Sequence, residues 1–195
     1  MKKVIIFISI LAAVLLMGLG IFIYFGHQDN SLATISQSQT RQSAQAAVGD
    51  PVRLTIPKIN VDATVEHLGL AADGTVAAPA GPYDVAWYSL GPRPGETGSA
   101  VISGHFGPWK SGAHSVFDRL SELKPGDIVS VTDNQGKTTS FVVRRTQIYN
   151  PGDSAPEVFN KNDGTYLNLI TCNGDWIPNQ KTYTKRLVVF TEKVQ

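Results

Sequence analysis

Short runs of alternating apolar and polar residues dominate the chain from residue 51 onward. Eight of these runs are rich in β-branched and aromatic residues and are bounded by Gly, Pro, Asn or Asp, which is typical of strands joined by turns. The predicted strands are Val52–Ile56, Val61–Leu68, Val85–Ser89, Ser99–Ser103, Ile128–Thr132, Ser140–Tyr149, Tyr166–Thr171 and Leu187–Thr191. Only Ser115–Leu123 has apolar residues at helical spacing. The pattern predicts an all-β domain with one or two short helices, either a small barrel or a sandwich. We favour the barrel, because closure removes exposed edge strands.

A different pattern covers the N-terminus, where Val4–Phe25 contains no charged residue. At a rise of about 1.5 Å per residue, a helix of this length can cross the hydrocarbon of a bilayer. The stretch is also longer than the roughly 7–15 apolar residues of a cleaved signal peptide. Because Lys2 and Lys3 precede it, the positive-inside tendency places the N-terminus in the cytoplasm. We expect residues 1–26 to be a cytoplasmic tip and a single-pass transmembrane anchor in the cell membrane, with everything that follows outside the cytoplasm.

Residues 27–50, between the expected anchor and the strand-rich region, are rich in Gln, Ser, Ala and Thr. Such a segment buries too little apolar surface to offset its ordering entropy, so we expect a flexible polar linker. Residues 51–195 then form one domain, long enough for a hydrophobic core. The whole chain has 17 basic and 16 acidic side chains. This balance argues against nucleic acid as a partner.

Cys172 is the only cysteine in the sequence. A single thiol in an extracytoplasmic domain is unusual, because such domains normally pair their cysteines or omit them. Cys172 directly follows the predicted strand Tyr166–Thr171, and the Asn-Gly pair behind it predicts a turn. If that strand pairs antiparallel with Leu187–Thr191, Arg186 lies beside the thiol. A permanent positive charge at that place favours the nucleophilic thiolate.

The predicted domain contains three histidines that are candidates for acid–base chemistry, His67, His105 and His114. His105 follows the apolar run Ser99–Ser103 and a glycine, so it lies at a strand exit, as Cys172 does. His67 lies within a predicted strand, which favours a structural role, and His114 lies in a polar loop, which favours solvation. A lone Cys is often a small buried hydrophobe, and a lone His is often a hydrogen-bonded surface residue. Residue types alone therefore leave the pairing of His105 with Cys172 open.

Motifs in a fixed order along the domain resemble the signature of the sortases. They are Gly98-Ser99-Ala100-Val101-Ile102-Ser103-Gly104-His105, Phe117-Asp118-Arg119-Leu120 with Leu123-Lys124-Pro125-Gly126-Asp127, Leu169-Ile170-Thr171-Cys172, and Arg186-Leu187-Val188-Val189. The resemblance covers Pro51–Lys193 and is greatest for class E/F and class D sortases. It implies that His105 is the catalytic histidine, Cys172 the nucleophile and Arg186 the catalytic arginine. Asn168 departs from the family pattern, which has Thr at that position.

The resemblance implies an eight-stranded sortase-type barrel and a membrane-anchored cysteine transpeptidase. Such an enzyme cleaves a C-terminal Leu-Pro-x-Thr-Gly-like sorting signal of secreted proteins and transfers the acyl group to an amine of a peptidoglycan precursor or to a pilin lysine. Cys172 would attack as the thiolate, and His105 would protonate the leaving amine. Arg186 would hold substrate carbonyls or the oxyanion, assisted by a backbone amide near Thr171. No cofactor is implied.

The remaining polar and aromatic candidates receive less support. No pair of His, Cys or carboxylate residues has the spacing of a zinc site. Some sortases bind calcium, and four acidic residues could line such loops, but none forms a recognisable calcium loop, so calcium activation is not indicated: Asp118, Asp127, Glu157 and Asp163. Trp109 and Trp176 follow closely on His105 and Cys172, and we expect them to be core or pocket-wall residues.

Two other interpretations remain open. An L,D-transpeptidase is also a cell-wall cysteine enzyme, but its cysteine normally follows closely on a Ser-His-Gly segment, whereas His105 precedes Cys172 by 67 residues. The second alternative is a non-enzymatic, membrane-anchored β-domain whose cysteine is inert. A fully buried, slowly reacting thiol would favour this second interpretation.

Overall fold

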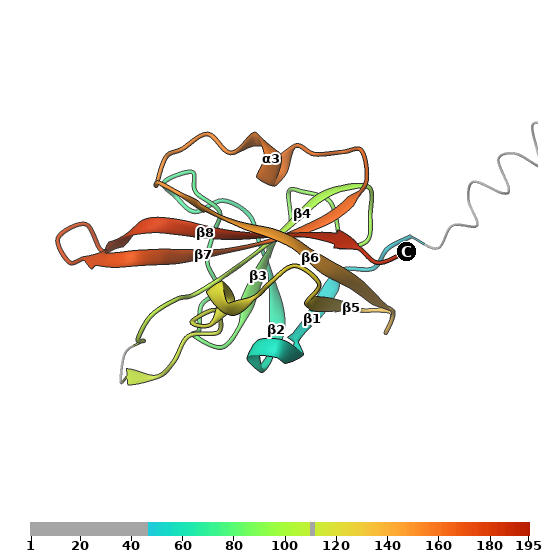
Figure 1. Cartoon of the computed structure of the whole chain (residues 1–195), viewed down its shortest axis with the longest axis horizontal. Helices are drawn as coiled ribbons and strands as arrows, with labels where there is room; N and C mark the ends of the chain where they lie inside the picture. The colour runs from blue at the N-terminus through green and yellow to red at the C-terminus, as the bar shows by residue number, and fades with distance from the viewer. Residues whose placement is uncertain (1–46, 110–111) are drawn as a thin grey trace, which may run out of the picture. The chain divides into compact units, whose positions relative to one another are not determined.

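Residues 47–109 and 112–195 are described by a computed structural model, and they form a closed β-barrel. Its strands are β1 (Pro51–Ile56), β2 (Val61–Leu68), β3 (Val85–Tyr88), β4 (Gly98–Gly104), β5 (Ile128–Asp133), β6 (Thr138–Tyr149), β7 (Thr165–Ile177) and β8 (Thr182–Lys193). They lie in the order β1-β2-β3-β4-β7-β8-β6-β5, and β5 pairs with β1 to close the barrel (Figure 1). The predicted eight-stranded barrel is confirmed for this part of the chain.

The expected membrane anchor at Val4–Phe25 and most of the expected linker lie outside the described residues. Within residues 47–109 and 112–195, no helix is long and apolar enough to cross a membrane. The compact unit formed by these residues begins at Val48, slightly before the expected start of the domain at Pro51. The last residues of the expected linker therefore belong to the barrel unit.

Alternate side chains of the strands fill the barrel interior. Leu54 and Ile56 of β1 are buried there, as are Leu167 and Leu169 of β7. Because successive side chains of a strand point to opposite faces, the same alternation places Cys172 on the outer face of β7. The nucleophile expected from the sequence therefore lies outside the packed core of the barrel.

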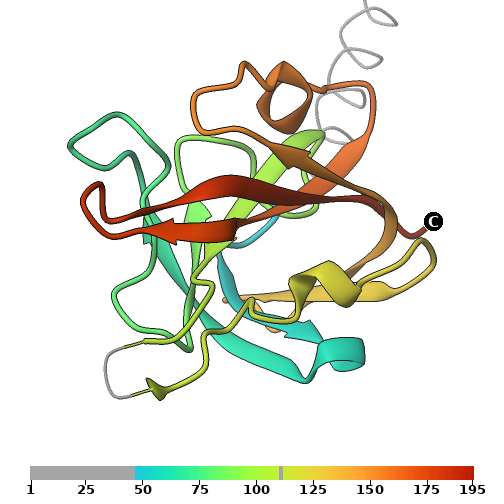
Figure 2. The ribbon, with the colours of Figure 1, turned by 60° about the vertical axis from the view of Figure 1, so that its left-hand side comes forward.

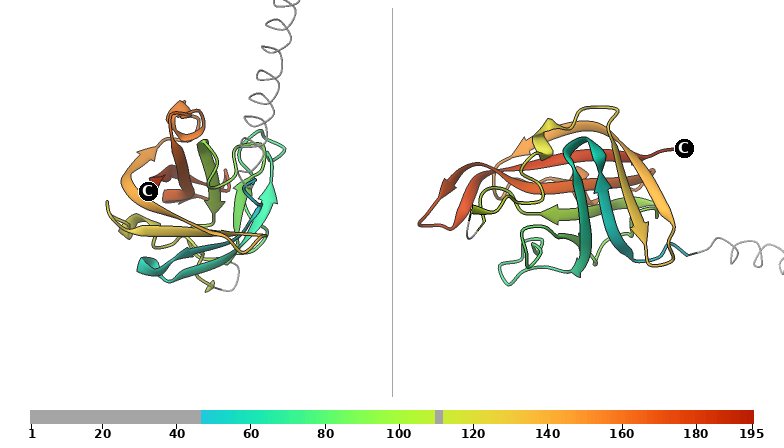
Figure 3. Two further views of the ribbon diagram at one scale, coloured as in Figure 1. Left: turned by 90° about the vertical axis from the view of Figure 1, so that its right-hand side faces the viewer. Right: turned by 90° about the horizontal axis from the view of Figure 1, so that it is seen from below.

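A second apolar cluster lies on the outside of the barrel, beside the short helix α3 (Pro156–Phe159). Its buried members are Val101, Tyr149, Val158, Val188 and Phe190. Figure 2 shows α3 in orange beside β6, β7 and β8, and Figure 3 shows it projecting from the outer surface of the barrel. Asn168 of β7 holds the helix in place, because its side-chain amide donates to the carbonyl of Val158 at 2.6 Å.

The helix predicted at Ser115–Leu123 is wrong over most of its length. Only Leu120–Glu122 is helical, as the 3₁₀ turn η3; a second 3₁₀ turn, η1, covers Pro57–Ile59. The amide of Phe117 donates to the carbonyl of His105 at 3.0 Å, a tertiary contact that fixes this segment to the end of β4. The apolar spacing instead serves burial in the barrel core, which takes up Phe117, Leu120 and Leu123.

The hairpin of β7 and β8 continues beyond the turn predicted at Asn173-Gly174. The pairing register shifts between Asn173 and Trp176, and Gly174 has a φ of 79°. This segment is therefore a bulge, a conformation that glycine adopts without steric cost, and the prediction of a turn is wrong. Because β7 runs on to Ile177, the hairpin extends well past Cys172, to the left in Figure 1.

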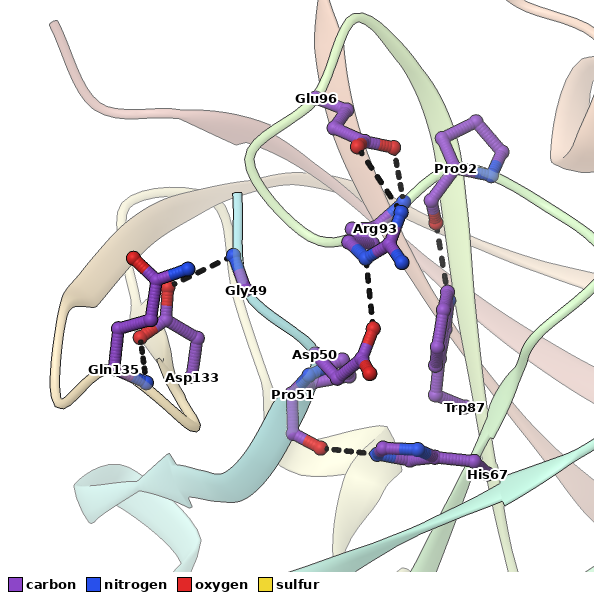
Figure 4. A network of polar contacts seen from close by, with 10 residues as sticks. All are labelled: Gly49, Asp50, Pro51, His67, Trp87, Pro92, Arg93, Glu96, Asp133 and Gln135. Carbon is purple, nitrogen blue, oxygen red and sulfur yellow. Dashed lines mark hydrogen bonds and ion pairs between the residues drawn. The ribbon is translucent and has the colours of Figure 1, made fainter. Parts of the chain in front are cut away.

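The chain enters the barrel through a network of polar contacts (Figure 4). The amide of Gly49 donates to the carboxylate of Asp133 at 3.2 Å. Asp50 forms an ion pair with Arg93 at 2.7 Å. Because both contacts cross to distant parts of the sequence, the segment before β1 is fixed to the barrel rather than hanging free of it.

The residue before β1 and the residue after β8 both form backbone hydrogen bonds with the hairpin of β5 and β6. The amide of Asn134 donates to the carbonyl of Asp50 at 2.8 Å, and the amide of Val194 donates to the carbonyl of Ser140 at 2.9 Å. These contacts lie at the opposite end of β8 from the β7–β8 tip, as Figure 3 also shows.

Candidate active site

The neighbouring parallel strands β4 and β7 bring the two predicted strand exits together. Ser103 lies opposite Ile170 in the register, and His105 and Cys172 each follow two residues later. Both residues line the same two hollows at the surface. The structure therefore brings together the histidine and the cysteine whose pairing the residue types alone left open.

Thr171 and Gly104 fasten the two strand ends to each other. The Thr171 hydroxyl donates to the Gly104 carbonyl at 2.8 Å and is buried. A Cβ at Gly104 would collide with the ring of Phe117, so a glycine is needed where Phe117 packs against this strand end. The side chain of Thr171 is thus engaged within the protein, and the contribution of a backbone amide near it stays a prediction.

Cys172 and Arg186 lie directly opposite each other in the antiparallel ladder of β7 and β8, as predicted. The thiol is partly exposed. Burial raises the pKa of Cys172 above its usual value, and the charge of Arg186 opposes this shift. Burial therefore disfavours the thiolate, and Arg186 is the neighbour that favours it.

The guanidinium of Arg186 is held by its own hairpin. Nη1 donates to the carbonyls of Tyr183 and Lys185 at 3.0 and 2.9 Å, and Nη2 donates to the hydroxyl of Thr182 at 2.9 Å. A guanidinium has five N–H donors in a fixed plane, so this anchoring leaves donors free while defining their direction.

The ring of His105 is oriented by a backbone carbonyl. Its Nε2 lies 2.8 Å from the carbonyl oxygen of Pro79, in the segment between β2 and β3. A carbonyl only accepts hydrogen bonds, so Nε2 carries the proton and Nδ1 is the nitrogen that is free to gain or lose one. The ring also packs on Trp109, with 4.6 Å between the ring centroids.

The first hollow, which we call the α3 groove, has a volume of about 400 Å³. It lies between α3 and the outer face of the barrel, and among the residues that line it are Tyr149, Ala155, Val158, Phe159, Ile170, Cys172, Arg186 and Val188. The hydroxyl of Tyr149 donates to Glu157 of α3 at 2.6 Å, and Asn168 bonds to the same helix. Asn168 at the position where the family pattern has Thr therefore helps to fix the wall of this groove.

The second hollow, which we call the aromatic pocket, has a volume of about 820 Å³. Among the residues that line it are His105, Phe106, Trp109, Cys172, Trp176, Lys181, Thr182 and Tyr183. The ring of Tyr183 meets those of Trp176 and Phe106 edge-on, at centroid distances of 5.1 and 5.3 Å. Burial raises the pKa of Tyr183, so its hydroxyl stays protonated at neutral pH.

Other residues singled out in the sequence lie as follows. His67 of β2 donates to the carbonyl of Pro51, away from both hollows, and the side chain of His114 is 94% exposed. Trp109 and Trp176 are pocket-wall residues, as expected. No cluster of three or more His, Cys, Asp or Glu side chains suited to a metal ion occurs among residues 47–109 and 112–195. Pro79 and Tyr183 were not predicted, because only the fold brings them next to the catalytic candidates.

Comparison with known proteins identifies the fold and the family. The Sortase domain family matches residues 54–194. Sortase C-1 from Actinomyces oris is 26% identical, with 80% of this chain and 82% of that chain covered and a TM-score of 0.59. Sortase C from Clostridium perfringens SM101 is 24% identical, with 75% of this chain and 71% of that chain covered and a TM-score of 0.56. Sortase A from Corynebacterium diphtheriae is 24% identical, with 77% of this chain and 64% of that chain covered and a TM-score of 0.56. No curated protein matches this chain.

Proposed function

Because this chain belongs to the sortase family, we propose that it is a cysteine transpeptidase in which Cys172, His105 and Arg186 act on sorting signals of secreted proteins. The observation that carries this proposal is the position of Cys172, which is paired across the ladder with Arg186 and borders two hollows together with His105. A partly exposed thiol at this place is suited to attack, whereas an inert structural thiol would be enclosed.

In the first step, the Cys172 thiolate attacks the carbonyl carbon before the scissile bond of a Leu-Pro-x-Thr-Gly-like signal. The C–S bond forms, the C–N bond breaks, and the proton on Nδ1 of His105 passes to the leaving amine. Arg186 donates to the substrate carbonyls or to the developing oxyanion. The apolar α3 groove holds the acyl part of the signal, since both Cys172 and Arg186 line it.

In the second step, an amine attacks the thioester and Cys172 leaves as the thiolate. The aromatic pocket is the place for this amine, because it borders Cys172 and His105 and none of its lining residues belongs to α3. His105 accepts the proton that the amine loses, so the enzyme returns to its starting state. The acceptor is an amine of a peptidoglycan precursor or a lysine of a pilin.

The expected anchor and linker at residues 1–50 complete this proposal. A single-pass anchor with a cytoplasmic N-terminus would keep the barrel at the outer face of the cell membrane, where secreted substrates and wall precursors are found. We assign the protein to class E/F or class D, and propose that it needs no cofactor. Neither the L,D-transpeptidase nor the inert β-domain gains support from the site geometry.

The proposal is tested by incubating the full-length protein with a panel of sorting-signal peptides and measuring covalent adducts by mass spectrometry. We expect an acyl adduct on Cys172, released by an added amine as a new amide. Cys172→Ala must form no adduct, while its melting temperature stays close to that of the parent. Lack of an adduct with every peptide, or an adduct that persists in Cys172→Ala, would overturn the assignment.

A further inference from the structure

Part of the segment between β2 and β3 contacts the ring of His105, the candidate catalytic histidine. We call residues 77–82 the strap. Its buried residue Pro79 presents the carbonyl that meets Nε2 of His105 at 2.8 Å. Since this contact comes from a backbone atom, the position of the strap as a whole determines whether the ring is held.

Side chains from two strands fasten the strap on either side of Pro79. The hydroxyl of Ser103, at the end of β4, donates to the carbonyl of Ala77 at 2.8 Å and is itself buried. The amide of Ala80 donates to the carboxylate of Glu66, on β2, at 3.0 Å. The carbonyl of Pro79 is thus fixed between two side-chain hydrogen bonds that both originate outside the strap.

We propose that Ser103 and Glu66 are positioning residues for His105, which act through the strap. This inference rests on the proposed function. With Nε2 kept as the donor to Pro79, Nδ1 is the nitrogen that gives its proton to the leaving amine as the C–S bond forms and the C–N bond breaks. A loosened strap would let the ring turn, and the proton would no longer lie in line with the departing nitrogen.

β4 provides a matched control in Ser99. Its hydroxyl is also buried on the same face of the strand and also donates to a loop carbonyl, that of Lys161 at 3.1 Å. This contact lies at the far end of β4 from His105. Ser103→Ala and Ser99→Ala therefore remove the same hydroxyl group from the same strand, but only Ser103→Ala removes a hydrogen bond to the strap.

The test compares two acyl donors that share one peptide sequence. One is a sorting-signal peptide that acylates Cys172 through its scissile amide bond, and the other is the thiophenyl ester of the same acyl segment. Expulsion of thiophenolate needs no proton, whereas expulsion of an amine does. In Ser103→Ala of the full-length protein, we expect acylation by the peptide amide to fall roughly 10- to 100-fold, the loss typical of a misplaced catalytic group. Acylation by the thiophenyl ester should stay within about twofold, as should both rates in Ser99→Ala.

Glu66 gives an independent check on the other side of Pro79. Glu66→Ala should reproduce the selective loss of the amide reaction, and Glu66→Gln should restore it because the amide oxygen still accepts from Ala80. Equal losses with both donors, or no loss in Ser103→Ala, would overturn the role of the strap. Failure of the parent protein to be acylated by either donor would instead refute the proposed function.

Discussion

Two histidines of this barrel make nearly the same local contacts and differ in what surrounds them. Nε2 of His67 lies 2.7 Å from the carbonyl of Pro51, and Nε2 of His105 lies 2.8 Å from that of Pro79. Each ring also packs against a tryptophan. His67 belongs to the polar network where the chain enters (Figure 4), whereas His105 borders two hollows together with Cys172. Orientation of a histidine ring by a carbonyl is therefore not sufficient for catalysis, which also needs a nucleophile and space for a substrate.

Exchanging each histidine for asparagine is the strongest test of this difference. His105→Asn should lower the kcat/KM of peptide cleavage by about 10²- to 10⁴-fold, because the proton donor is lost. His67→Asn should keep kcat/KM within about twofold and lower only the melting temperature. A comparable loss of activity in both variants would mean that the surroundings of His105 do not distinguish it.

Arg186→Lys tests whether Arg186, the neighbour of the proposed nucleophile Cys172, acts by its charge or by directed hydrogen bonds. Lysine keeps the charge but loses the planar fork that the β7–β8 hairpin holds in place. We expect peptide turnover to fall about 100-fold, as for removal of one oxyanion donor. Alkylation of Cys172 by iodoacetamide, which reports on thiolate content, should change little. Parallel losses in the two assays would show that Arg186 acts through ionisation of the thiol.

Trp176→Ala tests the role of the aromatic pocket, which borders His105 but not His67. The indole is a wall of the aromatic pocket, and its removal should weaken the binding of an acceptor amine. We expect the ratio of aminolysis to hydrolysis of the acyl-enzyme to fall about threefold to tenfold, which corresponds to the loss of one aromatic contact. The rate of acylation should not change. Tyr83→Ala is the control, because Tyr83 is an exposed aromatic residue that does not line this pocket.

Asp133→Asn addresses the polar network around His67 and should have the smallest effect on activity. Burial alone would raise the pKa of Asp133, but the amides of Lys137, Gln135 and Gly49 together lower it. A carboxylate with a lowered pKa contributes stability above its unfolded pKa of about 4, and this contribution is lost as the pH falls below that value. The melting temperature of the parent should therefore drop more steeply between neutral and acidic pH than that of Asp133→Asn. Equal slopes would assign the acid sensitivity to other groups.

The strands and the pairing of Cys172 with Arg186 were predictable because both follow from local pattern. An alternating run followed by a second one leaves few possible registers for a hairpin, and the register found is the expected one. His105 was predictable as a strand-end residue, and its nearness to Cys172 was implied by resemblance. The two wrong predictions, a turn and a helix, came from sequence patterns that are compatible with more than one local structure. Asn173-Gly174 is as favourable in a bulge as in a turn, and helical spacing at Ser115–Leu123 also suits packing of an irregular segment on a core.

The strap and the wall of the α3 groove were beyond prediction because they depend on backbone atoms. Pro79 acts through its carbonyl, and any residue type supplies one. Asn168 bonds to the carbonyl of Val158, so neither side-chain pattern nor spacing indicates the contact. Such contacts are set by where the loops lie, and loop positions follow from the completed barrel.

The shared attachment of both chain ends to the β5–β6 hairpin has a mechanical consequence. In the proposed reaction a substrate protein becomes joined to Cys172, and a pull between Cys172 and a chain held at Val48 would run along the strands. The paired backbone groups of β6 and β8 then bear the load in shear, side by side, instead of opening one after another as in a zipper. We expect the barrel to stay folded under such a pull, because ladder hydrogen bonds that are loaded together share the force.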